Sequence, residues 1–388
     1  MPLAIGLTAL TTLAQGLLVV LLLSVAFAWV LGAVPLLLAV GVLFCVGVSS
    51  FCVALSLRAL AEPPMLSEIA VAVDAEEAPA LWRLVEEVAG KLGSVVPQRL
   101  LLGLDAAFWV ACCRVGTLDA DGPSEHEGRI MHLPLPLLPF LEHDELAAVI
   151  AHELDHFRGD DVAYTSRFSP SFRTLEAAVG SMDHMQMPFE DLPGIGRIFG
   201  WVFRAPTQLS IALLTSAFHA NVQAIRRLRE HTADRAALEV VPPEVAAQAL
   251  LRIVILGRQL DDAAASDLEA VLDRRPTEER FAAAFARDGG YGTADPGHDR
   301  AEILAEALTL EPDHPLDSHP STHARLAAIG VDPNTLSLDR LFARPAMPAA
   351  ELLPLMLRDR LDLVLTKAQV AHMHDVAEVL RHEGLDQS

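Results

Sequence analysis

The first part of the chain is strongly apolar: no Asp, Glu, Lys, Arg or His occurs in Met1–Leu57. This stretch is too long for one membrane span, and Gly32 and Pro35 interrupt it. It therefore predicts a transmembrane helical hairpin over about Thr8–Leu31 and Val34–Leu57, because each half meets the roughly 20 residues that a bilayer requires. The alternatives are a buried pair of core helices and a cleaved signal peptide. The latter would need a basic N-terminal region, which is absent.

After the apolar stretch the pattern becomes that of a domain with both helices and strands. Ala75–Leu92 has apolar residues at helical spacing and predicts an amphipathic helix. Three short strands are predicted next, at Arg99–Leu104, about Phe108–Cys113, and Arg129–Leu133. The polar stretch Asp119–Glu127 predicts a loop between the last two strands.

The next predicted helix begins at Asp144 and ends at Gly159. Acidic residues in its first turn suit the positive end of the helix dipole. Leu146, Val149 and Ile150 recur at helical spacing and are expected to pack inward.

The rest of the chain is predicted to be almost entirely helical. Residues 195–220 are weakly hydrophobic, are interrupted by Arg197 and Arg204, and predict a tilted or interfacial helix pair next to the membrane. Further helices are predicted over Asn221–Glu239, Pro242–Leu260, Leu268–Arg274 and Glu278–Arg287, with two more in Ala349–His382 separated near Arg358 and Arg360.

Charge divides the chain into two parts. Its 388 residues carry a formal net charge of -22, yet its mean hydropathy is positive at +0.34. Every charged residue follows Leu57, which indicates a membrane anchor joined to an acidic body. The acidic body argues against nucleic-acid binding, which needs a basic surface. Arg58 is the first charged residue after the apolar stretch, and it favours a cytoplasmic position for the acidic body. The four cysteines include no C-x-x-C pair, which indicates reduced thiols.

Candidate chemistry is concentrated in the helix predicted to begin at Asp144. His152 and His156 are four residues apart, and Glu153 directly follows the first histidine. This spacing puts both imidazoles on one helix face, within reach of a single tetrahedral metal ion. Glu153 would lie beside the open fourth position and act as a general base toward a water held there. The alternative is a pair of partly buried histidines satisfied by hydrogen bonds.

A third metal ligand is expected from a later helix, because catalytic zinc sites with two histidines commonly add a carboxylate. Glu230 is the candidate, and His231 is a rival that points away from it by about 100 degrees. Asp234, one turn after Glu230, can accept the spare N–H of a ligating histidine and fix its orientation. An exposed helix with Arg/Glu pairs is the alternative.

Taken together, these motifs resemble the membrane-bound gluzincin metallopeptidases, the family of HtpX-like quality-control proteases and CAAX prenyl proteases. The resemblance covers about residues 65–330 and the preceding hairpin. The matching segments are, in order, Asp144-Glu145-Leu146, His152-Glu153-Leu154-Asp155-His156, Asp161, Arg229-Glu230-His231-Thr232-Ala233-Asp234, and His319-Pro320-Ser321-Thr322 with Arg325. Asp155 stands where the family usually has glycine, which adds a negative charge beside the ligands.

The resemblance implies a role for each matching residue. It implies one zinc ion per chain, bound by His152, His156 and Glu230, with Glu153 as the base. It also implies that His319 and Arg325 contact the substrate or stabilise the oxyanion.

The predicted fold is α+β and predominantly α-helical. It consists of a transmembrane helical hairpin at 1–60, a zincin-type metallopeptidase domain with a small β-sheet at 65–330, and a C-terminal helical extension at 331–388. The 195–220 segment falls within the second domain. The strand at Arg129–Leu133 is expected to be an edge strand that holds an extended substrate.

The predicted function is that of a zinc-dependent endopeptidase anchored by several spans in the bacterial inner membrane. Its catalytic domain would be cytoplasmic and would act in quality control of membrane or cytoplasmic proteins. The expected partners are protein or peptide substrates and the lipid bilayer, with no nucleic acid. Two alternatives remain: a regulatory sensor that cleaves one partner, and an inactive zinc-binding scaffold. The presence of Glu153 speaks against the scaffold.

Overall fold

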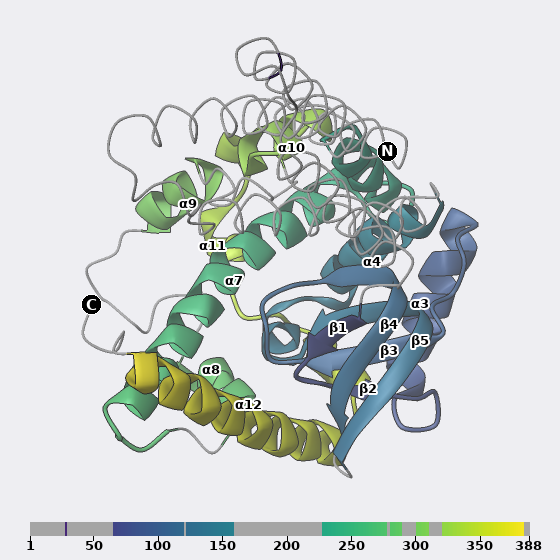
Figure 1. Ribbon diagram of the computed structural model, residues 1–388. Helices are drawn as coiled ribbons and strands as arrows, with labels where there is room; N and C mark the ends of the chain where they lie inside the picture. The colour runs from purple at the N-terminus through teal and green to yellow at the C-terminus, as the bar shows by residue number, and fades with distance from the viewer. Residues whose placement is uncertain are drawn as a thin grey trace. The chain divides into compact units, whose positions relative to one another are not determined.

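The computed structural model describes Ala28 and residues 65–119, 122–158, 227–277, 280–288, 300–309 and 320–383. The predicted hairpin, except for Ala28, and the 195–220 segment lie outside these residues. Among the helices that are described, none is both long enough and apolar enough to cross a bilayer. The described residues are mostly helical and include one small sheet, so the predicted α+β class is confirmed (Figure 1).

The sheet is mixed and has five strands in the order β1-β4-β5-β3-β2 (Figure 1). Its strands are β1 (Met65–Glu68), β2 (Ala70–Val73), β3 (Arg99–Gly103), β4 (Trp109–Asp119) and β5 (Gly122–Pro134). Strands β4 and β5 form a long antiparallel pair, while β1 and β3 run parallel to their neighbours β4 and β5. The sheet therefore has β1 and β2 at its edges.

The predicted loop at Asp119–Glu127 is wrong, because most of this stretch belongs to β5 and pairs with β4. The stretch is polar since this end of the strand pair is largely open to solvent. Exposed Glu125 and Glu127 alternate with half-buried Ser124 and His126. A period of two is the signature of a strand, and it was hidden here by the polar composition.

The predicted edge strand at Arg129–Leu133 is also wrong. This part of β5 pairs with β4 on one side and with β3 on the other, so it lies inside the sheet. The short strand β1 pairs only with Arg114–Thr117 of β4. Within the described residues, Trp109–Cys113 has no strand on that side, and the first half of β4 is an open edge.

One face of the sheet packs on helices α3 (Pro79–Leu92) and α4 (His143–Arg158). Side chains alternate along β3, so Leu100 and Leu102 join this core while Leu101 joins a smaller cluster on the other face. Burying this apolar surface holds α4 firmly against the sheet. That matters because α4 carries the histidine pair.

The remaining described elements are helical. The α-helices are α7 (Pro243–Leu272), α8 (Phe281–Asp288), α9 (Arg300–Thr309), α10 (Thr322–Ala328), α11 (Leu338–Leu341) and α12 (Leu355–Glu383). The 3-10 helices are η1 (Leu135–Phe140), η2 (Pro333–Thr335) and η3 (Ala349–Leu352). Residues 227–237 form a further helical segment before α7.

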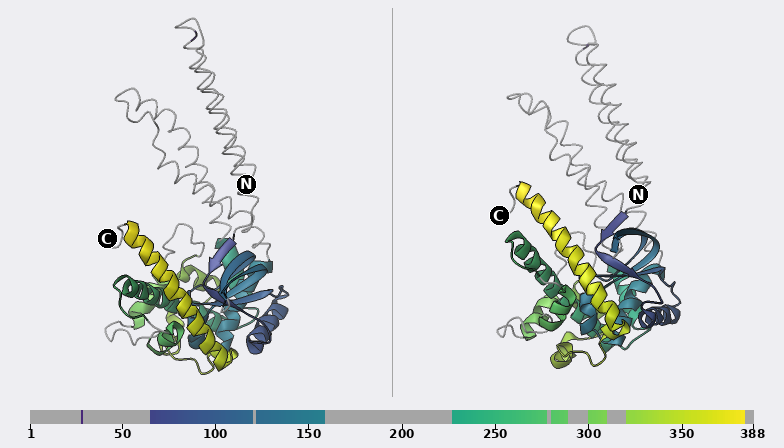
Figure 2. Two further views of the ribbon diagram at one scale, coloured as in Figure 1. Left: turned by 60° about the horizontal axis from the view of Figure 1, so that its bottom comes forward. Right: turned by 90° about the horizontal axis from the view of Figure 1, so that it is seen from below.

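Two pairs of predicted helices are each one continuous helix (Figure 2). Helix α7 runs through the predicted break after Leu260, and α12 runs through Arg358 and Arg360. Neither break contains a Gly or Pro that would end a helix, and the first is rich in alanine, the best helix former. Asp261, Asp262 and Arg360 are exposed and Arg358 is half-buried, and none of them interrupts the helical backbone.

Helix α12 packs on α7 and α8. Its Asp362 carboxylate accepts hydrogen bonds from the backbone N–H groups of Ala282 and Ala283 at 2.7 and 2.9 Å, and so caps α8. Leu357, Leu361 and Leu365 of α12 share one hydrophobic cluster with the sheet and α4. The predicted boundary at residue 330 stays a prediction.

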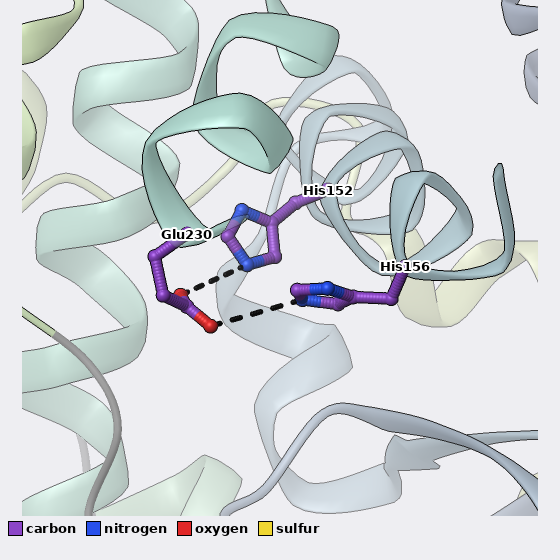
Figure 3. A group of neighbouring side chains, drawn as sticks. All are labelled: His152, His156 and Glu230. Carbon is purple, nitrogen blue, oxygen red and sulfur yellow. Dashed lines mark ion pairs between the residues drawn. The ribbon is translucent and has the colours of Figure 1, made fainter. Parts of the chain in front are cut away.

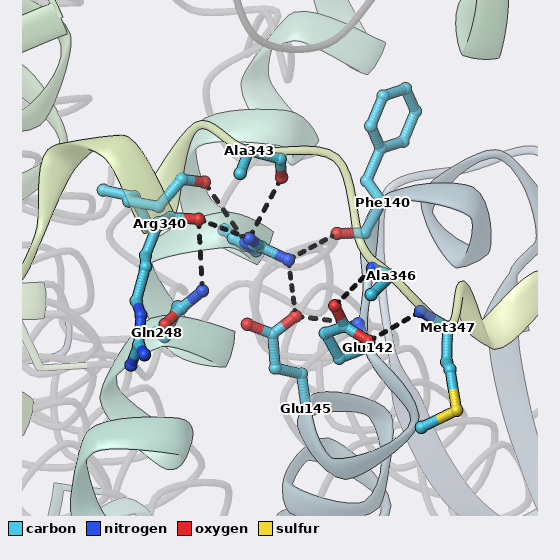
Figure 4. Close-up of polar contacts among 10 residues, drawn as sticks. Phe140, Glu142, Glu145, Gln248, Arg340, Ala343, Ala346 and Met347 are labelled. Atoms are coloured by element: carbon cyan, nitrogen blue, oxygen red, sulfur yellow. Dashed lines mark hydrogen bonds and ion pairs between the residues drawn. The ribbon is translucent and has the colours of Figure 1, made fainter.

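A fully buried arginine ties several of these elements together (Figure 4). Arg252 of α7 is 2% exposed, and its Nη1 donates to the Glu145 carboxylate in the first turn of α4 at 2.8 Å. It also donates to four backbone carbonyls, those of Phe140, Arg340, Leu341 and Ala343. The Glu145 carboxylate in turn accepts from the backbone N–H of Glu142. Arg252 thereby joins α7, η1, α4 and the chain after α11.

Replacing Arg252 with Met is expected to lower the free energy of unfolding by about 3–5 kcal/mol, because it leaves the Glu145 carboxylate buried without its cation. Urea unfolding of the purified protein measures this loss. Arg275→Met is the matched control, since Arg275 pairs with Asp273 on the surface and exposed pairs contribute at most about 1 kcal/mol. Equal losses in the two variants would contradict the role assigned to Arg252.

Candidate metal centre

Helix α4 presents two histidines from one face (Figure 3). His152 and His156 are one turn apart, and their ring centroids lie 5.1 Å from each other with the ring planes at 84°. His152 is 8% exposed, and His156 is partly buried. The helical spacing thus brings the two rings side by side, as the sequence predicts.

Glu230 meets these rings from the helical segment 227–237 (Figure 3). Its Oε2 lies 3.4 Å from His152 Nε2, and its Oε1 lies 3.8 Å from His156 Nε2. Ligand atoms of all three residues lie within 4.8 Å of one another. Bonds of about 2.0–2.1 Å in a tetrahedral zinc site put ligand atoms roughly 3.3–3.5 Å apart. The donor set therefore fits one zinc ion: the His152–Glu230 pair has this spacing, and the His156–Glu230 pair is slightly wider.

The opposite side of the His152 ring is held by Asp234. His152 Nδ1 lies 3.0 Å from Asp234 Oδ1, and a carboxylate can only accept, so Nδ1 carries the hydrogen. Arg325 of α10 donates to both Asp234 oxygens, from Nη2 at 2.6 Å and from Nε at 3.0 Å. This chain of contacts fixes the ring and directs Nε2 toward Glu230.

The buried charges at this site perturb two pKa values. Burial alone would lower the pKa of His152, but hydrogen bonds to Asp234 and Glu230 outweigh it and raise this pKa to about 10. Burial opposes ionisation of Asp234, yet contacts with His152 and Arg325 lower its pKa to about 2. A metal ion bound at Nε2 would displace the proton that these carboxylates favour on the ring. The carboxylates that hold this proton would equally stabilise a metal cation.

Glu153 lines a cavity of about 740 Å³ together with His152, and it is itself 8% exposed. Ala106–Phe108, just before β4, form another part of the wall. Helix α7 adds largely apolar residues, among them Leu250 and Ile253. A carboxylate next to two clustered histidines, in a cavity with apolar walls, is placed to exchange protons with a bound molecule.

The other predicted site residues have different outcomes. His319 and Asp161 lie outside the described residues. Arg325 borders the cavity, and its guanidinium is engaged with Asp234. His231, the rival ligand, is not part of the cluster, and its Nδ1 is buried without a hydrogen-bond partner among the described residues. Asp155 is buried, and its carboxylate accepts from Arg158 at 3.3 Å.

No feature of the sequence indicates that Ala106–Phe108 line the cavity. These residues are small or apolar and carry no chemical signature. Only their position at the start of β4, beside α4, brings them to the site.

Comparisons with known proteins agree with this geometry. The model of Peptidase family M48 matches residues 126–331, which is more than half of the chain. The chain is 30% identical over 183 residues to a protein named "Protease HtpX homolog" from Polynucleobacter necessarius subsp. necessarius (strain STIR1), over 47% of this chain and 57% of that protein. It is 27% identical over 183 residues to one of the same name from Paraburkholderia phytofirmans (strain DSM 17436 / LMG 22146 / PsJN), over 47% and 58%. The chain thus spans little more than half the length of these relatives. The comparison with solved structures gave no significant match.

Proposed function

Because this chain belongs to peptidase family M48, we propose that it is a membrane-anchored zinc-dependent endopeptidase. The observation that carries the proposal is the convergence of His152, His156 and Glu230, whose ligand atoms lie within 4.8 Å of one another. His152 and the adjacent Glu153 also line one cavity. The names of the two similar proteins, both described as proteases, support it. Membership of the zincin fold is part of the same proposal.

One zinc ion would be held by His152, His156 and Glu230. When bound, it would supply a Lewis acid that polarises a peptide carbonyl and lowers the pKa of water. The cluster offers three donors, so the fourth coordination position of a bound zinc ion would remain open to water or the peptide carbonyl.

Glu153 is the proton carrier in this proposal. Its carboxylate takes a proton from the attacking water and later delivers it to the leaving amine. Asp234 and Arg325 act through His152: they keep its hydrogen on Nδ1 and leave Nε2 free for the metal. Apolar residues of α7, among them Leu250 and Ile253, form part of the cavity wall beside Glu153.

The substrate is proposed to bind as an added strand along Trp109–Cys113 of β4. Among the described residues this stretch has no strand partner on the side where β1 pairs with the rest of β4, and it begins directly after the wall formed by Ala106–Phe108. Backbone hydrogen bonds along such an edge hold a peptide in extended form regardless of its sequence. Arg129–Leu133, the substrate-binding strand predicted from the sequence, lies inside the sheet, so Trp109–Cys113 takes this role in the proposal.

The cellular setting belongs to the proposal as well. The charge-free stretch Met1–Leu57 would form the anchor, with the catalytic domain on the cytoplasmic side of the inner membrane. The substrates would be damaged membrane or cytoplasmic proteins. An extended binding edge suits unfolded segments, since only these can supply a free strand.

Metal removal tests the proposed function. The full-length protein, purified in detergent, is expected to cleave casein, to lose this activity on treatment with 1,10-phenanthroline, and to recover it when zinc is added back. Gel electrophoresis measures cleavage, and metal analysis measures zinc in each sample. Undiminished cleavage by zinc-free protein would overturn the proposal, and so would a zinc-loaded protein that cleaves nothing.

A further inference from the structure

We propose that His132 of β5 is a positioning residue for the substrate: it fixes the backbone of Ala106–Phe108 and, through it, the start of the open edge of β4. The inference rests on the proposed function, because it assigns a task at the same site. Nothing in the sequence around His132 indicates it. The buried position of the His132 side chain and its hydrogen bond to Ala107 indicate this role.

His132 is buried next to the place where Ala106–Phe108 lead into β4. It is 1% exposed and pairs across the sheet with Trp109, the first residue of β4. The two rings stack with centroids 5.1 Å apart and planes only 6° from parallel. The imidazole therefore has one packed orientation.

That orientation directs a hydrogen bond to the cavity wall. His132 Nδ1 lies 2.8 Å from the carbonyl oxygen of Ala107, and a carbonyl can only accept, so Nδ1 carries the hydrogen. Ala107 and its two neighbours line the cavity that also contains Glu153. The Nδ1–H of His132 thus fixes the backbone carbonyl of Ala107, the middle residue of Ala106–Phe108.

The other ring nitrogen is also engaged. Nε2 lies 3.2 Å from Asp105 Oδ1. Burial lowers the pKa of His132 to about 4, so the ring is neutral. Its Nε2 faces the side chain of Asp105, which is itself exposed to solvent. Both nitrogens of His132 thus contact the segment that leads into β4.

Gly103 provides the space for this ring. A Cβ atom at Gly103 would lie 2.3 Å from His132 Nε2, closer than atoms can approach. The His132 ring therefore packs directly against the backbone of β3 at Gly103 while it contacts the cavity wall at Ala107. A histidine that only filled the core would need neither the hydrogen bond to Ala107 nor the contact with Asp105.

Two substitutions separate the positioning role from simple packing. In His132→Asn the side-chain amide nitrogen can take the place of Nδ1 and keep the hydrogen bond to Ala107. In His132→Gln the amide reaches instead toward the place of Nε2, and the bond to Ala107 is lost. Both variants lose the ring stacked on Trp109, so they share the packing defect and differ in the hydrogen bond.

The experiment compares both variants with the unchanged full-length protein in steady-state cleavage of a peptide. His132→Gln is expected to raise KM roughly 5- to 10-fold, the effect of losing about one hydrogen bond, with kcat and zinc content nearly unchanged. His132→Asn is expected to keep KM within about twofold of the parent, because it retains the bond to Ala107. Equal KM values in both variants, or parallel losses of kcat and zinc, would overturn the proposal.

Hydrogen exchange over residues 106–113 gives a readout that does not depend on activity. Exchange in His132→Gln is expected to be faster than in His132→Asn, because only the former releases the Ala107 carbonyl. If the unchanged protein cleaves peptide but the variants do not differ, only the role of His132 fails. If the unchanged protein cleaves nothing, the proposed function fails, and equal exchange in the two variants would then reject the contact as well.

Discussion

Replacing Glu153 with glutamine is expected to lower kcat for peptide cleavage by roughly 100- to 10,000-fold, the usual contribution of a positioned general base. The amide has nearly the same size as the carboxylate but cannot take up a proton. Glu153 is not one of the three clustered ligands, so zinc content should stay at the parent level. Cleavage rates and metal analysis of the same preparations test both halves of this expectation.

The matched control for this variant is Glu87→Gln. Glu87 lies on the surface of α3, where it pairs with Lys91, and it is not one of the residues that line the cavity. Its rate should equal that of the parent. Cleavage at the parent rate by Glu153→Gln would exclude Glu153 as the base, and loss of zinc from this variant would show that the residue supports the metal instead.

The second large effect is expected at Glu230. Glu230→Ala should release zinc, because it removes one of only three donors, and the affinity should fall by more than in Asp234→Asn. The Asp234 change leaves all three donors in place and weakens the contacts of residue 234 with His152 and Arg325. Loss of such a supporting contact typically costs 10- to 100-fold in metal affinity. Competition against a zinc-binding dye measures both affinities.

His231→Ala is the control that separates the two neighbouring candidates. It should retain zinc, since His231 is not part of the cluster. If His231→Ala lost zinc while Glu230→Ala kept it, the assignment of the third ligand would be wrong. If Asp234→Asn lost as much affinity as Glu230→Ala, Asp234 would have to be counted among the ligands.

The helical period alone accounts for much of the site. Four residues separate His152 from His156, and any α-helix brings such residues to one face. The same period could not choose between Glu230 and His231, because it says nothing of how a later helix is rotated about its own axis relative to α4. The contact of Arg325 with Asp234, which joins residues 91 positions apart, was equally beyond a local pattern.

The errors in the predicted fold have two causes. Polar composition was taken for a loop in β5, and helix breaks were predicted within α7 and α12, although the backbone is regular in all three places. The edge of the sheet was misplaced because strand order is set by long-range pairing. The α+β class and the approximate positions of α3, α4, α8, β3, the first parts of β4 and α7, and the helical segment 227–237 followed from periodicity.

The most direct test of the account is the identity of the metal and its ligands in the purified full-length protein. Anomalous diffraction at the zinc edge should show one zinc ion per chain, bound by Nε2 of His152, Nε2 of His156 and a carboxylate oxygen of Glu230, each at about 2.0–2.2 Å. A zinc ion held by other residues, or Glu230 turned away from a zinc ion bound to the histidines, would contradict it.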